Sequence, residues 1–330
     1  MQKVKWAVLG TSNFALDWIA RGVQLARNAE LVAIISRDEE RGKAACERLG
    51  VPRTYGSIQA IDTNEVDGIF MTLPNTLHAP MAIEAARHGL HVVGEKPMAT
   101  SLDECRQMIE AAQAAGVVLA TAQCMEWTSP VIKTRELLAS GAIGENVSCS
   151  ISASYRGSPD PEHLRKPTID QGGGQLFDMG VHAIDAIMRL LGPIEQVAGY
   201  VGTPVKDYLP ENGSIVLAKF ASGVMGTIEA HGTCYQNSFV IQGTNGRIWS
   251  DEWWGREFAG DLHMQVGKER TDFDLPTTMV YQHQAEHVSE SIMEGKVPVI
   301  AGERGMANIA VIEAAIESSR TGQFVNVQAG

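Results

Sequence analysis

Hydrophobic and polar positions follow one pattern through about the first 120 residues. Short apolar runs alternate with helical patterns, which is typical of a parallel sheet whose strands are joined by crossover helices. The pattern predicts strands over 4–9, 31–35, 66–71, 91–95 and 117–122. It predicts helices over 38–49 and 79–87, and a third helix that has a capping box at Ser101 and Glu104 and ends at Gly116.

The pattern changes after residue 124. Ser129 and Pro130 start a helix that reaches Gly141, and strand-like runs follow with few helices between them. These runs cover 147–155, 196–201, 214–220, 224–230, 239–242 and 247–250, and a last helix covers 305–319. We therefore expect an α/β fold with a parallel-sheet domain over 1–123. A second domain of helices and a mostly antiparallel sheet covers 124–330, and its C-terminal helix can pack back on the first domain.

Composition and charge limit the partners of the chain. The 330 residues are enough for two domains, and the net charge of −12 argues against nucleic acid and anionic membranes, which attract clustered Lys and Arg. The five cysteines are scattered without a Cys-x-x-Cys pair, so we predict no metal site and no redox dithiol. Since neither a signal peptide nor a membrane-spanning apolar stretch is apparent, we expect a cytoplasmic protein.

A candidate nucleotide site follows the first predicted strand. The segment comprises Gly10, Thr11, Ser12, Asn13, Phe14 and Ala15. It matches the G-x-G-x-x-G/A pattern at its ends, and Ser12 stands where the second glycine is usual. The N–H groups of the following helix would bind a pyrophosphate, and the Ser12 hydroxyl could bond a phosphate oxygen. The alternative is an ordinary strand-to-helix turn.

The end of the second strand predicts the cofactor. Ser36 and Arg37 stand where an acidic residue would bind the ribose of NAD, and Arg41 follows one turn later. A hydroxyl and guanidinium groups suit a 2′-phosphate, so we predict NADP(H), with NAD(H) as the alternative. In that alternative, Asp38 reaches the ribose and both arginines are solvated.

Two segments after later strands complete this half of the candidate site. Leu73, Pro74, Asn75 and His78 follow the strand over 66–71, on the ligand side of a parallel sheet, where a plain turn is the alternative. Glu95, Lys96 and Pro97 end the strand over 91–95. A lysine there can stabilise charge on a substrate oxygen and join proton transfer. The alternative is a surface Lys96 paired with Glu95.

A second group of ionisable residues lies on one predicted helix. Asp178, His182, Asp185 and Arg189 are spaced along one helical stripe, after the glycine run 172–174. Apolar residues occupy the opposite side, so we expect the stripe to face outwards from the core. A histidine can shuttle a proton near neutral pH, and a neighbouring carboxylate can orient it. The alternative is a solvated face with a His–Asp pair.

These motifs together resemble the glucose–fructose oxidoreductase / inositol dehydrogenase / MocA (Gfo/Idh/MocA) family over essentially the whole chain. The resemblance rests on Gly10 to Ala15, Leu73-Pro74-Asn75 with His78, Glu95-Lys96-Pro97, and Gly173-Gly174 with Asp178, Gly180, His182 and Asp185. It implies an N-terminal Rossmann domain and a C-terminal domain with a large open antiparallel sheet, which often forms a dimer or tetramer surface. It also implies catalytic roles for Lys96 and His182, with Asp178 holding the histidine or the substrate. Ser12 and the segment 123–126, where many relatives carry an Arg, depart from the family pattern.

We therefore expect an NADP(H)-dependent oxidoreductase that transfers hydride to or from a carbinol or carbonyl carbon of a sugar, polyol or diol. Lys96 and His182 would assist proton transfer, and both would contact substrate together with Asp178. Arg165 precedes the glycine run and is a further candidate substrate contact, although a solvated loop is the alternative. Two other functions stay open: a non-catalytic dinucleotide-sensing regulator and an NAD-dependent lyase or glycosidase.

Overall fold

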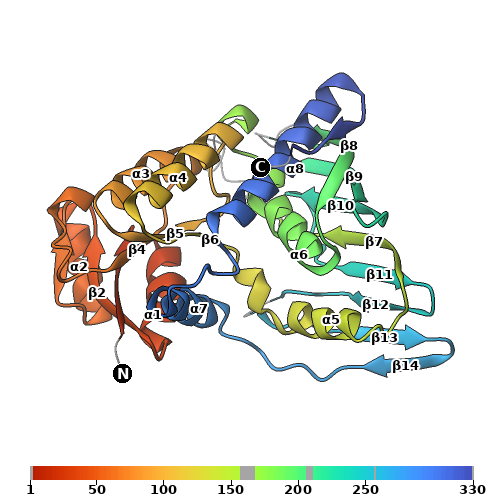
Figure 1. Cartoon of the computed structure of the whole chain (residues 1–330), viewed down its shortest axis with the longest axis horizontal. Coiled ribbons are helices and arrows are strands. Elements are labelled where there is room, and N and C mark those ends of the chain that lie inside the picture. The colour runs from red at the N-terminus through yellow and green to blue at the C-terminus, as the bar shows by residue number, and fades with distance from the viewer. Residues whose placement is uncertain (1–2, 157–167, 206–210, 256–257, 329–330) are drawn as a thin grey trace. The chain divides into compact units, whose positions relative to one another are not determined.

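The computed structural model describes residues 3–156, 168–205, 211–255 and 258–328 (Figure 1). The chain forms two compact units. The first comprises Met1–Cys124 and Met279–Met306, and the second comprises Met125–Thr278 and Ala307–Gly330. Residues 279–306, which the sequence places with the C-terminal domain, thus fold with the first unit. No helix in the described ranges is both long and apolar enough to cross a membrane.

The first unit contains a six-stranded parallel sheet with the order β3-β2-β1-β4-β5-β6. The strands are β1 (Val4–Leu9), β2 (Ala29–Ile35), β3 (Arg53–Tyr55), β4 (Gly68–Met71), β5 (His91–Glu95) and β6 (Leu119–Ala122). This order reverses direction between β1 and β4, which is where a doubly wound sheet opens its ligand crevice. The predicted Rossmann class is confirmed.

Helices cover this sheet and connect its strands (Figure 1). They are η1 (Ala15–Ala20), α1 (Arg21–Leu25), α2 (Glu39–Leu49), α3 (His78–Arg87), α4 (Leu102–Ala115) and α7 (Val280–Glu294), with short turns η2 (Ile58–Ala60) and η3 (Asn75–Leu77). At α4 the Ser101 hydroxyl accepts a hydrogen bond from the Glu104 N–H, as predicted. The Glu104 carboxylate, however, accepts from the N–H and hydroxyl of Thr100, so the predicted capping box is only half formed.

Helix α7 was not predicted from the sequence. This helix is anchored to the start of the chain, since the fully buried Trp6 donates its indole N–H to Ser289 at 2.9 Å. Asn28 likewise donates to the Glu286 carbonyl oxygen at 2.9 Å. Because these contacts join residues more than 250 positions apart, the local pattern gave no sign of them.

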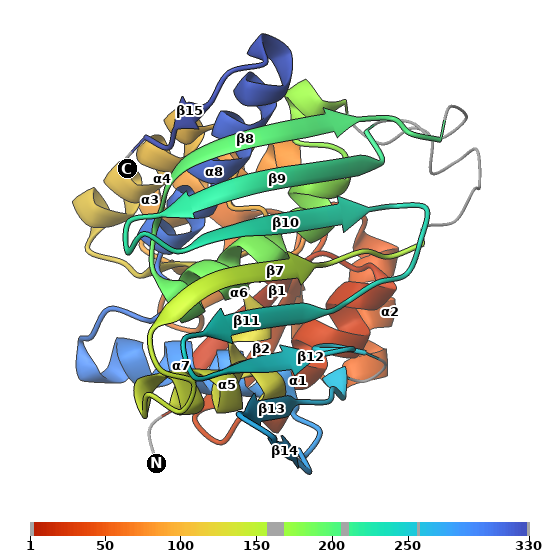
Figure 2. The same cartoon turned by 90° about the vertical axis from the view of Figure 1, so that its right-hand side faces the viewer.

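The second unit contains a nine-stranded sheet with the order β14-β13-β12-β11-β7-β10-β9-β8-β15 (Figure 2). The strands are β7 (Asn146–Ser152), β8 (Ile194–Gly202), β9 (Gly213–Phe220), β10 (Met225–His231), β11 (Phe239–Gly243), β12 (Gly246–Ser250), β13 (His263–Val266), β14 (Glu269–Asp272) and β15 (Val325–Asn326). Only β7 and β10 pair in parallel. The sheet is thus mostly antiparallel, as the sequence predicts.

The helices of the second unit lie on one face of its sheet, behind the strands in Figure 2. They are α5 (Ser129–Ala139), α6 (Val181–Leu191) and α8 (Gly302–Thr321), of which α8 begins in the first unit, and short helical turns η4 (Cys124–Trp127), η6 (Ile169–Gln171) and η7 (Leu176–Gly180) precede α5 and α6. Alternate residues of β9 are buried and exposed, which shows that along this strand no described residues cover the other face of the sheet. On the covered face, Ser318 and Ser319 of α8 accept hydrogen bonds from the β8 backbone at 3.0 Å.

Candidate active site

The turn after β1 requires a glycine at position 10. Gly10 has φ +129°, a conformation that side chains rarely adopt. A Cβ atom there would lie 2.2 Å from the Thr72 Oγ1 atom and 2.9 Å from the Thr72 carbonyl oxygen. Thr72 follows β4 and bonds Leu9 through both its N–H and its hydroxyl. The turn is therefore packed against the end of β4, at the reversal point of the sheet order.

Ser12 serves this turn as a helix cap. Its Oγ atom accepts a hydrogen bond from the Ala15 N–H at 3.1 Å, and its carbonyl oxygen accepts from the Leu16 N–H. The hydroxyl hydrogen remains a donor for an anion beside the helix start. Phe14, 39 % exposed, stacks edge-on to Tyr281 of α7. A Gly–x–Ser turn at a helix start thus fits a pyrophosphate. Thr11 belongs to this turn and is half-buried, and the exposed Asn13 and Phe14 begin the helix.

The end of β2 carries the residues that are predicted to distinguish NADP(H) from NAD(H). Asp38 caps α2, since one carboxylate oxygen accepts from the Arg41 N–H at 3.1 Å and the other lies 3.8 Å from the Arg41 guanidinium. The Ser36 hydroxyl donates to the Asp38 carbonyl oxygen at 2.8 Å, and Ser36 is 9 % exposed. The Ser36 donor is thus used within the turn, and the contact of Ser36 with a 2′-phosphate stays a prediction. Arg37 and Arg41 are exposed.

His78 links two of the predicted segments. Its ring is fully buried, with Nδ1 2.7 Å from the Pro97 carbonyl oxygen and Nε2 2.8 Å from that of Leu73. Burial lowers the pKa of His78, while the two hydrogen bonds oppose that shift. Both polar atoms of the ring lie against backbone carbonyl oxygens, so His78 holds these segments in position, and its cofactor contact stays a prediction. The ring ties the Leu73-Pro74-Asn75 turn to the Lys96–Pro97 turn.

Lys96 follows β5 at the carboxyl end of the sheet. It is half-buried, its N–H donates to the Glu95 carboxylate at 3.2 Å, and the Lys96–Pro97 peptide bond is cis. Tyr281 of α7 adds a phenol to this edge, and burial, followed by the proximity of Cys124 and Glu95, raises the pKa of Tyr281 well above its usual value. Tyr281 was not predicted from the sequence, because α7 reaches the sheet only through tertiary packing.

In the second unit, His182 and Asp178 lie on consecutive helical segments. Asp178 is half-buried in the π-helical turn η7, and His182, 5 % exposed, is in the first turn of α6. The wider π turn alters the α-helical spacing that the sequence analysis assumed for these two residues. Trp254 lies beside the imidazole, with ring centroids 6.3 Å apart and a 47° tilt. An almost fully buried histidine at the start of a helix is a candidate acid or base.

The predicted outward stripe of α6 is largely buried. Asp185 is 1 % exposed and accepts a hydrogen bond from Asn308 of α8 at 3.0 Å. Arg189, exposed at the helix end, bonds the buried carboxylate of Glu126 at 3.1 and 3.2 Å. The solvated-face alternative is therefore wrong for His182 and Asp185. Asp185 and Arg189 instead join α6 to neighbouring elements, because another layer covers this side of the helix.

Glu126 gives the segment 123–126 a structural role. Its carboxylate, 4 % exposed, pairs with Arg135 of α5 as well as with Arg189. Two guanidinium groups from two helices thus share one buried carboxylate, which is an arrangement of charge-assisted hydrogen bonds. The segment that departs from the family pattern therefore fixes η4 to α5 and α6.

Glu211 supports the turn before His182. Its carboxylate accepts from the Leu176 N–H at 3.2 Å, and burial raises the pKa of Glu211 to about 7, against the opposing effect of its backbone hydrogen bonds. Gly174 has φ +95°, and a Cβ atom there would lie 2.3 Å from the Glu211 carboxylate. The glycine therefore makes room for this acid. Arg165, the remaining predicted substrate contact, lies outside the described residues.

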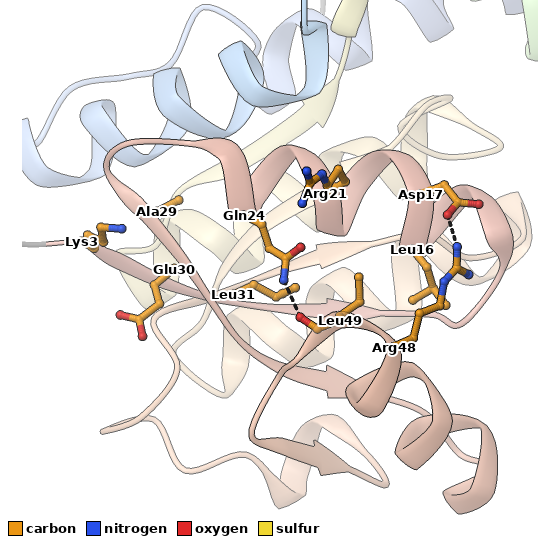
Figure 3. Close-up of a pocket in the computed structure, with 10 residues that line it drawn as sticks. All are labelled: Lys3, Leu16, Asp17, Arg21, Gln24, Ala29, Glu30, Leu31, Arg48 and Leu49. Carbon is orange, nitrogen blue, oxygen red and sulfur yellow. Dashed lines mark hydrogen bonds and ion pairs between the residues drawn. The ribbon is translucent and has the colours of Figure 1, made fainter.

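Figure 3 shows a different pocket of the first unit. It is lined by Lys3, Leu16, Asp17, Arg21, Gln24, Ala29, Glu30, Leu31, Arg48 and Leu49. Gln24 donates to the Leu49 carbonyl oxygen at 2.7 Å, and Arg48 pairs with Asp17. The pocket reaches the amino-terminal ends of β1 and β2, whereas dinucleotides bind beyond the carboxyl ends of parallel strands. We therefore do not assign the nucleotide to this pocket.

Comparisons with known proteins agree with this architecture. Residues 4–123 match the family described as an oxidoreductase family with an NAD-binding Rossmann fold, and residues 131–249 match the GFO/IDH/MocA C-terminal domain. The 1,5-anhydro-D-fructose reductase of Ensifer adhaerens is 26 % identical over 331 residues, or 99 % of both chains. D-xylose 1-dehydrogenase (NADP(+)) 2 of Haloferax volcanii is 28 % identical over 327 residues, 98 % of this chain and 99 % of the relative.

A solved structure extends the similarity to the whole fold. The aldose–aldose oxidoreductase from Caulobacter crescentus, complexed with glycerol, superimposes with a TM-score of 0.90 at 25 % identity. The similarity covers 98 % of this chain and 100 % of that one. The similar proteins named here are oxidoreductases whose names specify sugars or sugar derivatives.

Proposed function

The chain belongs to the Gfo/Idh/MocA family of NAD(P)-dependent oxidoreductases, and from this premise we propose that it uses NADP(H) to oxidise or reduce a sugar, a polyol or a diol. The observation that carries the proposal is the turn that presents Lys96. This turn is fixed through His78 at the carboxyl end of the parallel sheet, beside the segment that follows β4. A lysine held at that edge suits chemistry on an oxygen next to a bound nicotinamide.

The proposed reaction divides between the cofactor and three side chains. A bound nicotinamide would supply the hydride acceptor for the carbinol carbon, or the hydride donor for the carbonyl carbon. In oxidation, His182 takes the hydroxyl proton and Lys96 stabilises the negative charge that builds on the oxygen. Asp178 orients the imidazole or a substrate hydroxyl. In reduction, His182 returns the proton to the same oxygen. The histidine thus acts as base in oxidation and as acid in reduction.

The exposed arginines after β2 support NADP(H) over NAD(H). Asp38 is engaged as the cap of α2, and Arg37 and Arg41 are the positive groups beside the predicted ribose. We expect the double variant Arg37→Ala/Arg41→Ala to bind NADPH about tenfold or more weakly and NADH almost unchanged, since guanidinium–phosphate bonds are lost. Fluorescence titration measures both affinities. Lys43→Ala, in the same helix and paired with Glu39, is the control. Tighter binding of NADH than NADPH by the unaltered protein would reverse the assignment.

Replacing Lys96 separates catalysis from cofactor binding. We expect Lys96→Ala to lower kcat/KM by about 10²- to 10⁴-fold, because an oxygen-stabilising and proton-transferring group is lost, while NADPH binding persists. NADPH absorbance over a panel of aldoses, ketoses, inositols and diols identifies the substrate first. Conversion of a substrate with no net change in NADPH would favour the lyase alternative. Full turnover in Lys96→Ala would remove the lysine from the mechanism.

We also propose that copies of the chain associate through the uncovered face of the nine-stranded sheet. Four apolar side chains gather on that face, and we call them the open-face group: Tyr200, Ile215, Leu217 and Met225, which are 83, 45, 50 and 63 % exposed. Between β8 and β9, Tyr200 lies opposite Ile215. Between β10 and β9, Met225 lies opposite Lys219, which is two residues after Leu217 on β9. The group is therefore contiguous. A contiguous apolar patch of this kind marks an interaction surface. A homodimer or homotetramer is the assembly that such a face supports.

A further inference from the structure

Three potential metal ligands converge near one edge of the nine-stranded sheet. His263 is the first residue of β13, and Asp251 follows β12 directly. Asp261 closes the loop between these two strands. Each residue offers one ligand atom, and the three atoms lie within 4.8 Å of one another. No metal site was predicted from the sequence, and the spacing of these residues matches no common ligand motif.

The distances between these atoms fit a shared metal ion better than a hydrogen bond. The His263 Nε2 atom lies 3.5 Å from the Asp261 Oδ2 atom and 4.0 Å from the Asp251 Oδ2 atom. A protonated nitrogen would draw an acceptor to about 2.7–3.2 Å. Two atoms that share a transition-metal ion at about 2.1 Å each can lie at most about 4.2 Å apart. Both separations fall between these limits.

The other polar atoms of the site are already held in place. The His263 Nδ1 atom lies 2.6 Å from the Asp272 carboxylate, which therefore accepts its proton and leaves the Nε2 lone pair facing Asp251 and Asp261. The Asp261 Oδ1 atom accepts from the Ser250 hydroxyl at 2.9 Å and from two backbone N–H groups at 2.8 and 3.1 Å. Metal-binding histidines commonly donate their second N–H to a carboxylate in this manner.

The site is open to solvent. The Asp251 side chain is 76 % exposed and that of Asp261 is 40 % exposed, so an ion can enter from solvent.

We propose that His263, Asp251 and Asp261 bind a divalent transition-metal ion such as Zn²⁺ or Mn²⁺, with water completing its coordination. One imidazole and two carboxylates suit these ions. Asp251 and Asp261 flank the loop between β12 and β13, so the ion fastens the base of this loop. The same loop carries Trp254, which lies beside His182. On the proposed function, the ion therefore stabilises the wall of the substrate site next to the catalytic histidine.

Binding tests the site without any assay of activity. After treatment with a chelator and its removal, the full chain is titrated with Zn²⁺ and with Mn²⁺ in a calorimeter. We expect one ion per chain and a rise in thermal midpoint. Asp261→Asn keeps an oxygen that can accept the hydrogen bonds now made to Oδ1, but it replaces Oδ2, the proposed ligand atom, by an amide nitrogen. We expect this variant to bind the ion at least about tenfold more weakly. Glu269→Gln, an exposed change in β14, is the control and should bind as the unaltered protein does.

A local probe identifies where the ion binds. The Trp249 ring lies 5.1 Å from the His263 ring, so Co²⁺ at the site should quench the Trp249 fluorescence. The quenching should weaken in Trp249→Phe, which removes the nearest ring named here, and in Asp261→Asn, which removes a ligand atom. Absence of stoichiometric binding, or equal binding by Asp261→Asn and the unaltered protein, would overturn the metal site. If binding occurs and no substrate turns over, the site stands and only its link to catalysis fails.

Discussion

Glu211 is an acid whose environment makes stability depend on pH. Its ordinary pKa of 4.5 is raised to about 7 by burial. Between these two values the unfolded chain loses the proton while the folded chain keeps it, so the folded state binds more protons and stability falls as pH rises. This loss of folding stability is absent below about pH 4.5 and complete above about pH 7, where it reaches about 3 kcal/mol.

The variant Glu211→Gln should lack this dependence. It retains an oxygen that can accept the Leu176 N–H but cannot ionise. We therefore expect its stability relative to the unaltered protein to increase by up to about 3 kcal/mol between pH 4.5 and 8. Denaturant midpoints at several pH values measure the difference, with the exposed Glu47→Gln as the control. Curves that stay parallel across this range would show that Glu211 does not titrate as argued.

The residues of the candidate site differ in how far sequence could identify them. Gly10, Lys96 and His182 stand in local motifs, because a tight turn, a strand end and a helix start each need neighbouring residues of a defined kind. Tyr281 and Glu211 carry no such signal. They reach these segments through the packing of distant elements, and their altered pKa values arise only from the resulting burial. Asp185 is likewise buried by the packing of a distant element, so its predicted exposure is wrong.

At the scale of elements, the Glu126 carboxylate joins three of them. It pairs with Arg135 of α5 and Arg189 of α6 and itself belongs to η4. We expect Glu126→Gln to destabilise the fold by about 2 kcal/mol, because two guanidinium groups lose the charge that compensates them. The figure is below that for a fully buried pair, since the arginine side chains are 37 and 36 % exposed. Urea unfolding measures the change.

A matched replacement in α5 isolates the effect of burial. Glu136 pairs with Lys133, and both side chains are exposed, at 59 and 36 %. Glu136→Gln should change stability by less than about 0.5 kcal/mol, as is usual for exposed ion pairs. Equal losses in the two variants would indicate that the Glu126 interaction is no stronger than a surface pair, and the proposed joint between η4, α5 and α6 would have to be abandoned.

The sequence predicted long, strongly patterned elements better than short or exposed ones. Strands β1 and β9 follow clear apolar patterns, and helix α2 is bounded by its caps Asp38 and Gly50. The predicted and observed bounds of all three nearly coincide. By contrast, β3 has three residues and the residues of β14 are exposed, so neither bears an apolar pattern. Such strands form because a neighbouring strand offers its backbone for pairing, which local sequence does not record.

At the scale of the whole molecule, the uncovered face of the nine-stranded sheet determines the expected assembly. Exposed strand residues on such a face are usually polar, whereas the open-face group here is apolar and runs across β8, β9 and β10. Burying these side chains between two copies would remove their apolar surface from water at about 25 cal/mol per Å². We therefore expect the purified protein to sediment as a dimer or tetramer.

Leu217→Glu tests this expectation directly. Leu217 is 50 % exposed, so a glutamate there is tolerated by the isolated chain but places a charge in the middle of the proposed contact. We expect sedimentation velocity to show a shift towards monomer, with a circular dichroism spectrum that does not change. Met293→Glu in α7, 42 % exposed and outside the face, should leave the assembly intact. A protein that is monomeric without substitution, or an oligomer that persists in Leu217→Glu, would mean that the apolar face serves another contact.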